Sequence, residues 1–172
     1  RGLLLRAVAV PLASASTRAA FYRELRLMSL DGTCLDVADT PPNDEAFGRP
    51  GSSRREGGGA FPQLRVVALA ESGTHAIVDA ALGPCTSSEQ ALADRLWGSL
   101  EPGMLCLADR NFYGFERFQT ARATGAQLLW RVRSDIALAR ERTLPDGSYL
   151  TSIYAPGNRR ARRDGQRARV IE

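Results

Sequence analysis

The chain has 172 residues and a mass of 18.7 kDa, which is the size of a single domain with a hydrophobic core. Apolar residues make up 44% and charged residues 24%, so the composition is that of a globular protein and excludes disordered and fibrous classes. No apolar run reaches the roughly 18 residues that predict a membrane-spanning helix, so a membrane partner is not expected.

Positive charge is concentrated at the C-terminal end. All 23 basic residues are arginines. Residues 1–153 contain 17 arginines and 17 acidic residues, whereas residues 154–172 contain 6 arginines and 2 acidic residues, so the net charge of +4 lies in this last segment. The segment is expected to contact a polyanion, and a solvated arginine-rich loop is the alternative.

The first half of the chain predicts antiparallel strands after an N-terminal segment. Residues 1–24 are expected to be helical or irregular. Residues 26–37 alternate in β fashion around Asp31-Gly32, which is typical of a hairpin turn, so two short strands are expected. TPPN and residues 47–59 are rich in Gly and Pro and predict a loop, and residues 63–82 predict two strands joined by a turn.

The second half alternates helices with strands. Ser87 or Ser88 is a candidate N-cap for a helix through Leu100, with leucines recurring every four residues. The expected elements after it are a buried strand at 104–109, a helix at 114–125, a strand at 126–134, a hairpin at 144–154 and a last strand in RVIE. This order predicts an α/β fold with strand–helix–strand crossovers.

Carboxylates at the ends of two apolar strands are the strongest chemical signal. Asp31 follows RLMSL and Asp109 follows MLCLA. An acid at the mouth of a central strand lies where ligands bind in α/β sheets. Two converging carboxylates without His or Cys favour Mg²⁺ or Mn²⁺ over zinc. Each aspartate alone is also a common turn or cap residue, which is the simpler interpretation.

Seven ordered segments carry a family resemblance. They are LMSLDGTCLDVADTPPN, FGRPGSSR, FPQLRVVALAESGTHAI, the SEQALA helix start, LADRNFYGF, LLWRVRS and LPDGSYL. Together they resemble bacterial insertion-sequence transposases of the DDE superfamily, in the insertion sequence four group, from about Phe21 to the C-terminus. The resemblance implies an RNase H-like mixed sheet with flanking helices.

The resemblance assigns roles to the two aspartates. Asp31 matches the first catalytic aspartate and Asp109 the second, and both would bind Mg²⁺ or Mn²⁺. Asp36 and Asp39 are rival acids near the first position. The family's third acid is a glutamate on a later helix, in a context with tyrosine and arginine, and no such motif is found. The chain is therefore interpreted as an incomplete and inactive catalytic fragment.

The resemblance also suggests an organisation of the chain. Residues 1–24 would be an N-terminal helical remnant, 25–140 a partial RNase H-like catalytic core, and 141–172 the start of a β-rich, arginine-rich insertion. DNA contacts are expected from arginines on one side of the strand at 126–134 and from the C-terminal cluster: Arg131, Arg133, Arg159, Arg160, Arg162 and Arg163.

The expected function is a DNA transposase acting by metal-dependent strand cleavage and transfer. Its partners would be double-stranded DNA at transposon ends and target, with homodimerisation of the full-length protein left open. Three cysteines without a CxxC pair indicate a reducing compartment, here the bacterial cytoplasm at the nucleoid. Two alternatives are a stand-alone metal-dependent nuclease, with Glu71, Glu116 or Glu172 as third acid, and an inactive DNA-binding remnant of a decayed transposase.

Overall fold

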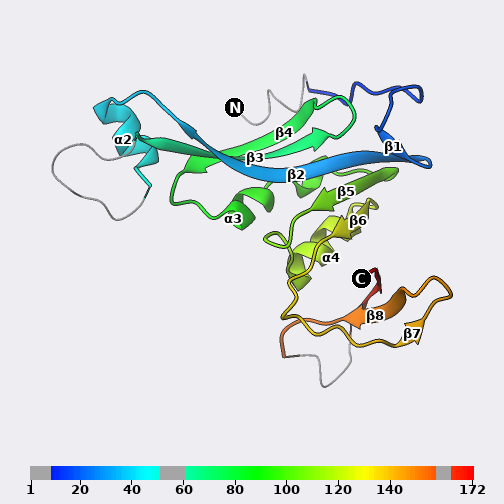
Figure 1. Cartoon of the computed structure of the whole chain (residues 1–172). Coiled ribbons are helices and arrows are strands. Elements are labelled where there is room, and N and C mark those ends of the chain that lie inside the picture. Colours follow the sequence, from blue (N-terminus) through cyan, green and yellow to red (C-terminus); the bar gives the residue numbers. More distant parts are fainter. Residues whose placement is uncertain (1–8, 51–60, 158–163) are drawn as a thin grey trace.

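The structure is a computed structural model, and it describes residues 9–50, 61–157 and 164–172. The larger of its two sheets follows the order β4-β3-β2-β5-β6, with β1 paired to β2 (Figure 1). Its strands are β1 (Phe21–Tyr22), β2 (Leu25–Asp36), β3 (Gln63–Glu71), β4 (Ile77–Pro84), β5 (Met104–Ala108) and β6 (Gln127–Trp130). The smaller sheet has the order β7-β8-β9 and consists of β7 (Arg142–Thr143), β8 (Tyr149–Ile153) and β9 (Gln166–Val170).

Strand directions in the larger sheet change at β2. β2, β3 and β4 form an antiparallel meander, whereas β2 pairs with β5, and β5 with β6, in parallel. Parallel neighbours need crossover connections, which here contain α3 (Glu89–Ala93), the short 3₁₀ helix η1 (Trp97–Ser99) and α4 (Phe115–Ala123). The predicted α/β class, with a mixed sheet and flanking helices, is confirmed.

The core lies between the sheet and these helices, which cover the same face (Figure 1). Alternate residues of β2 point into it, with Met28 0% and Leu30 3% exposed. Leu92, Leu96 and Leu100 meet them from the α3–η1 segment, as their four-residue spacing predicts. The helical segment is shorter than predicted, because α3 ends at Ala93 and the chain continues through a turn into η1.

Trp130 completes this core from the end of β6. Its ring lies 5.6 Å from that of Trp97 and 5.6 Å from that of Phe118, measured between centroids. Cys106 lies in the same cluster, and burial raises the pKa of its thiol to about 11. A thiol that stays protonated at neutral pH is a core residue rather than a nucleophile.

The hairpin predicted at Asp31-Gly32 is wrong, because β2 runs unbroken through this dipeptide. Gly32 does not adopt the positive φ that a type I′ turn requires. β3 pairs with one edge of β2 from Met28 to Asp36, and β5 pairs with the other edge up to Leu30. These hydrogen bonds hold the strand straight against its local turn preference.

One further prediction for the N-terminal half is wrong, and a second is narrowed to one of its alternatives. The TPPN segment is not a loop but begins α2 (Pro41–Phe47), with Thr40 as N-cap and proline in the first turn, where its missing N–H costs little. Of the helical or irregular structure expected for residues 1–24, residues 9–20 have the irregular form, with turns and no helix, so a helical remnant is not seen in this range. Within the described ranges, no helix combines the length and apolar character needed to cross a bilayer.

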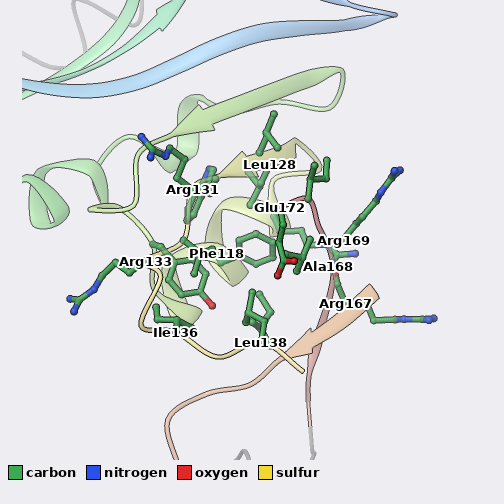
Figure 2. A pocket seen from close by; sticks show the side chains of 18 of the residues that line it. Phe118, Leu128, Arg131, Arg133, Ile136, Leu138, Arg167, Ala168, Arg169 and Glu172 are labelled. Carbon is green, nitrogen blue, oxygen red and sulfur yellow. The ribbon is translucent and has the colours of Figure 1, made fainter. Parts of the chain in front are cut away.

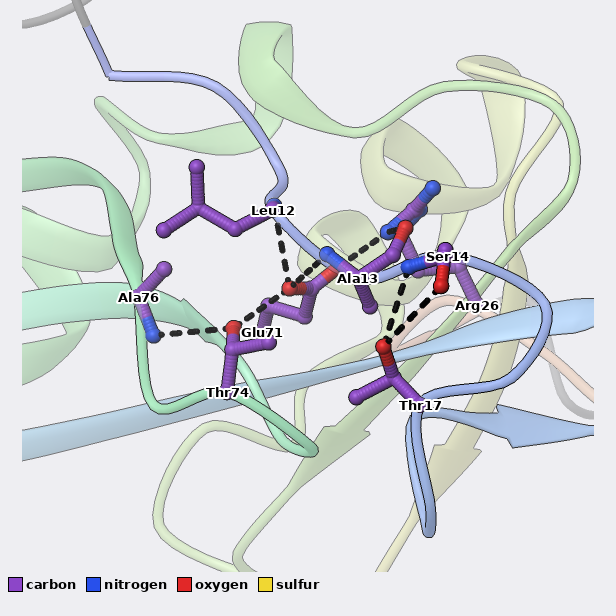
Figure 3. A network of polar contacts seen from close by, with 8 residues as sticks. All are labelled: Leu12, Ala13, Ser14, Thr17, Arg26, Glu71, Thr74 and Ala76. Atoms are coloured by element: carbon purple, nitrogen blue, oxygen red, sulfur yellow. Dashed lines mark hydrogen bonds and ion pairs between the residues drawn. The ribbon is translucent and has the colours of Figure 1, made fainter.

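A buried carboxylate holds the N-terminal segment on the sheet (Figure 3). Glu71, at the end of β3, is 0% exposed and accepts hydrogen bonds from the backbone N–H groups of Leu12 (3.1 Å) and Ala13 (2.8 Å). Thr74 and Arg26 also donate to this carboxylate. Burial by itself would raise the pKa of Glu71, but these four donors together lower the pKa below its ordinary value of 4.5.

Candidate metal centre

The sheet register brings Asp31 and Asp109 to equivalent positions on neighbouring strands. The last pair of the parallel ladder is Leu30 with Ala108, and each aspartate is the next residue along its strand direction. Adjacent strands lie about 4.8 Å apart, so the two residues are side by side where the parallel pairing ends. Both are exposed, as a site open to solvent and substrate requires.

The chain turns away from the sheet immediately after β5. The Asp109 carboxylate accepts the backbone N–H of Asn111 (3.2 Å), and the Asp109 carbonyl accepts the N–H of Phe112 (3.1 Å). Phe112 is 1% exposed and anchors this turn in the core. β2 continues to Asp36 and so extends beyond this turn. Open α/β sheets bind ligands at the carboxyl ends of their strands, which is where the two aspartates lie.

A third acid, Glu89, lies against the same two strand ends. It is the first residue of α3, and its Oε2 accepts the Asn111 side-chain amide at 2.6 Å. A Cβ built on Gly32 would lie 3.0 Å from the Glu89 carboxylate, so a side chain at position 32 would require Glu89 to shift by a few tenths of an ångström. Sequence analysis did not identify Glu89, although Gly32 directly follows Asp31 and Asn111 closely follows Asp109.

The other candidate acids do not join the aspartate pair. Asp36 accepts a hydrogen bond from Gln63, and Asp39 pairs with Arg49 at 2.6 Å. Asp36 also faces the opposite side of β2 from Asp31, because the strand is uninterrupted. The three glutamates considered for a nuclease lie elsewhere: Glu71 is in the N-terminal network, Glu116 is exposed on α4, and Glu172 pairs with Arg140.

The pair of carboxylates suits a hard divalent cation. Mg²⁺ is commonly held by one or two carboxylates, with waters and substrate phosphates completing its coordination shell. In the part of the chain that the structure describes, no three Asp, Glu, His or Cys side chains come together as a metal-binding group. The residues present therefore fit one cation that keeps several waters, not a fully protein-bound ion.

The prediction that Arg131 and Arg133 lie on a strand is wrong. β6 ends at Trp130. The Arg131 N–H still donates to the Ala108 carbonyl (3.0 Å), and the chain then leaves the sheet. Arg133 lies beyond the strand and forms a two-point ion pair with Asp135 at 2.9 and 2.6 Å. The four arginines of the C-terminal cluster, Arg159, Arg160, Arg162 and Arg163, lie outside the described residues.

A cavity of about 740 Å³ lies between the end of β6 and the β8–β9 pair. Apolar side chains including Phe118, Leu128 and Leu138 line its interior, and Figure 2 shows the guanidinium groups of the neighbouring arginines directed outward from it. These arginines are Arg131, Arg133, Arg167 and Arg169. We call these four residues the arginine rim. Arg133 pairs with Asp135 and Arg169 with Asp146, so part of its positive charge is neutralised.

Comparison with known proteins identifies the class of protein to which this chain belongs. Residues 22–171 match the family model for the transposase DDE domain. The chain therefore belongs to the transposase DDE domain family, and the resemblance seen in its sequence is confirmed.

Two curated relatives and one solved structure resemble the chain. Transposase InsG for insertion sequence element IS4, from Escherichia coli strain K12, is 28% identical over 131 residues, which is 75% of this chain and 29% of InsG. The putative transposase InsZ of the same strain is 28% identical over 109 residues, 63% of this chain and 36% of InsZ. The cryo-EM structure of the piggyBac transposase synaptic complex with hairpin DNA covers 76% of this chain and 30% of that chain, with a TM-score of 0.46 and 11% identity.

Proposed function

We propose that this chain provides two metal-binding aspartates of a DNA transposase, Asp31 and Asp109, for metal-dependent strand cleavage and transfer. The observation that carries the proposal is their placement side by side at the open end of the β2–β5 ladder. Membership of the transposase DDE domain family supports it. The chain covers 29% of the length of InsG and 36% of the length of InsZ. The whole transposition reaction is therefore proposed for a protein of the length of these relatives, to which this chain would contribute the two aspartates.

The chain's own residues would hold and orient the cation. The carboxylates of both aspartates would bind Mg²⁺ or Mn²⁺. Such an ion would supply either activation of a water or DNA 3′-hydroxyl or stabilisation of the leaving oxygen, the two roles that a two-metal site divides between its ions. The Asn111 N–H bonds one oxygen of Asp109 and thereby orients the other. β5 pairs with β2 as far as Leu30, and the phosphodiester is proposed to approach the cation from this edge of β2.

DNA is the partner proposed for the arginine rim. Arg131, Arg167 and Arg169 are exposed beside the cavity, and arginines of this kind bind phosphates without reading sequence. The proposed substrates are double-stranded transposon ends and target DNA, and the proposed compartment is the bacterial cytoplasm at the nucleoid. Homodimerisation of the full-length transposase is part of the same proposal.

Replacement of either aspartate should remove a weak Mn²⁺ site. We expect one site per chain in the wild-type protein, and at least a tenfold loss of affinity in Asp31→Asn and in Asp109→Asn, since loss of residues that merely support a ligand already costs 10–100-fold. The measurement is the electron paramagnetic resonance signal of free Mn²⁺ during a titration.

The control is Asp146→Asn, which removes an exposed carboxylate from the turn between β7 and β8. This aspartate pairs with Arg169 in the smaller sheet, so its loss should leave Mn²⁺ affinity unchanged. Equal affinity of the wild type and both site variants would contradict the proposed function.

A further inference from the structure

We infer that Glu89 is a positioning residue that fixes the Asp109 turn against β2 and so sets the geometry of the aspartate pair. The inference rests on the proposed function and names a residue from a different element, at the start of α3. Its basis is a continuous set of contacts that joins the two aspartates through neighbouring residues. None of these contacts involves a metal.

The first contact joins α3 to the turn that follows β5. Glu89 Oε2 accepts the Asn111 side-chain amide at 2.6 Å. Gln90 reinforces it, because its side-chain amide donates to the Asn111 carbonyl at 2.6 Å. Asn111 in turn donates its backbone N–H to the Asp109 carboxylate at 3.2 Å. A displacement of Asn111 would therefore change the direction of the Asp109 side chain.

The second contact joins the same carboxylate to β2. The space that a side chain at position 32 would occupy is filled by the Glu89 carboxylate, with both Cδ and Oε1 3.0 Å from an ideal Cβ. Gly32 is the residue after Asp31, and its N–H donates to the Asp31 carboxylate at 2.8 Å. Glu89 thus lies against Gly32, the residue after Asp31, and bonds Asn111, which is two residues after Asp109.

The geometry favours positioning over direct metal binding. Leu30 points into the core beneath α3, so Asp31 faces the opposite side of β2, whereas Gly32 faces Glu89. The oxygens of Glu89 are already engaged, one by Asn111 and the other 3.9 Å from the Arg65 guanidinium. Asp31, Asp109 and Glu89 accordingly do not form a three-carboxylate metal group among the described residues.

Four variants test the inference through Mn²⁺ affinity. Glu89→Ala and Asn111→Ala should each weaken binding about tenfold, the lower end of the range for residues that support metal ligands. The double variant should be no weaker than either single variant, because both remove the same hydrogen bond. Glu89→Gln should stay within about threefold of the wild type, since its amide oxygen still accepts from Asn111. Asn111→Ala keeps the backbone N–H and the helix intact if Glu89→Ala fails to fold.

The control is Glu116→Ala, which removes an exposed acid from the equivalent first turn of α4 and should leave Mn²⁺ affinity unchanged. Wild-type affinity in both Glu89→Ala and Asn111→Ala, or a Glu89→Gln loss as large as that of Glu89→Ala, would overturn the inference. If Asp31→Asn and Asp109→Asn also bind Mn²⁺ like the wild type, the proposed function is wrong and the inference falls with it. If those two variants lose binding, the failure is specific to Glu89.

Discussion

Replacing Glu71 with alanine should lower the free energy of unfolding by about 3–5 kcal/mol, the cost of breaking a buried ion pair by removing one partner. Arg26 would lose its carboxylate, and the N–H groups of Leu12 and Ala13 would lose their acceptor. The N-terminal segment should then detach from the turn between β3 and β4. Urea denaturation followed by circular dichroism measures the change in unfolding free energy.

The contribution of the Glu71 carboxylate to the unfolding free energy should depend on pH. The folded protein lowers the pKa of Glu71 below 4.5, so the charged form stabilises the fold. This contribution is fully present above about pH 4.5 and is lost as the pH falls through the lower pKa of the folded state. The difference in unfolding free energy between wild type and Glu71→Gln should therefore shrink below pH 4.5.

Glu24→Ala is the matched control for Glu71, because Glu24 is an exposed acid between β1 and β2. Its removal should change the unfolding free energy by no more than about 0.5 kcal/mol, as for most surface substitutions. A Glu71→Ala effect as small as that of Glu24→Ala would show that the N-terminal segment is held by other contacts.

The second prediction with a large expected effect concerns the joining of DNA strands. The 172-residue chain should give no detectable joined product with Mg²⁺ or Mn²⁺ and donor-end DNA, in a gel assay for transfer of a labelled 3′-end. Two aspartates suit one cation, whereas the two-metal mechanism stabilises both the attacking and the leaving oxygens. Loss of one such electrostatic contribution costs about 3–4 kcal/mol, or about 10²–10³ in rate.

The aspartate variants make this expectation falsifiable. Joining that is robust in the wild type and abolished in both Asp31→Asn and Asp109→Asn would mean that this chain already supplies a third carboxylate. Joining that persists in both variants would instead indicate a contaminating enzyme, and repeated purification of the variants would remove it.

Much of the fold follows from local sequence patterns. The paired strands β3 and β4, the buried strand β5 and helix α4 all lie where hydrophobic spacing and turn residues predict them. The error at Asp31-Gly32 has a physical cause, because a local turn preference contains no information about partners on both edges of β2. Thr40 and Pro41 are typical residues for the start of a helix and do begin α2, but consecutive prolines are also typical of loops, which is why the sequence predicts a loop there.

The candidate site can be predicted from the sequence where it depends on strand ends, but not where it depends on packing. Asp31 and Asp109 each follow an apolar strand, and this pattern can be read from the chain alone. The placement of Glu89 depends on how α3 docks over Gly32 and beside Asn111, which lies 22 residues further along the chain. Arg131 and Arg133 were misplaced because β6 ends where Trp130 turns into the core.

Paramagnetic broadening by Mn²⁺ is the most direct test of the aspartate site, since a chain of 18.7 kDa suits solution NMR and weak binding does not prevent the measurement. Substoichiometric Mn²⁺ should broaden the backbone amide signals of residues 31–33 and 109–111 first. The signals of β8 and β9 should stay sharp at the same Mn²⁺ concentration. Broadening centred on any other part of the chain, or none at residues 31–33 and 109–111, would contradict a metal site formed by Asp31 and Asp109.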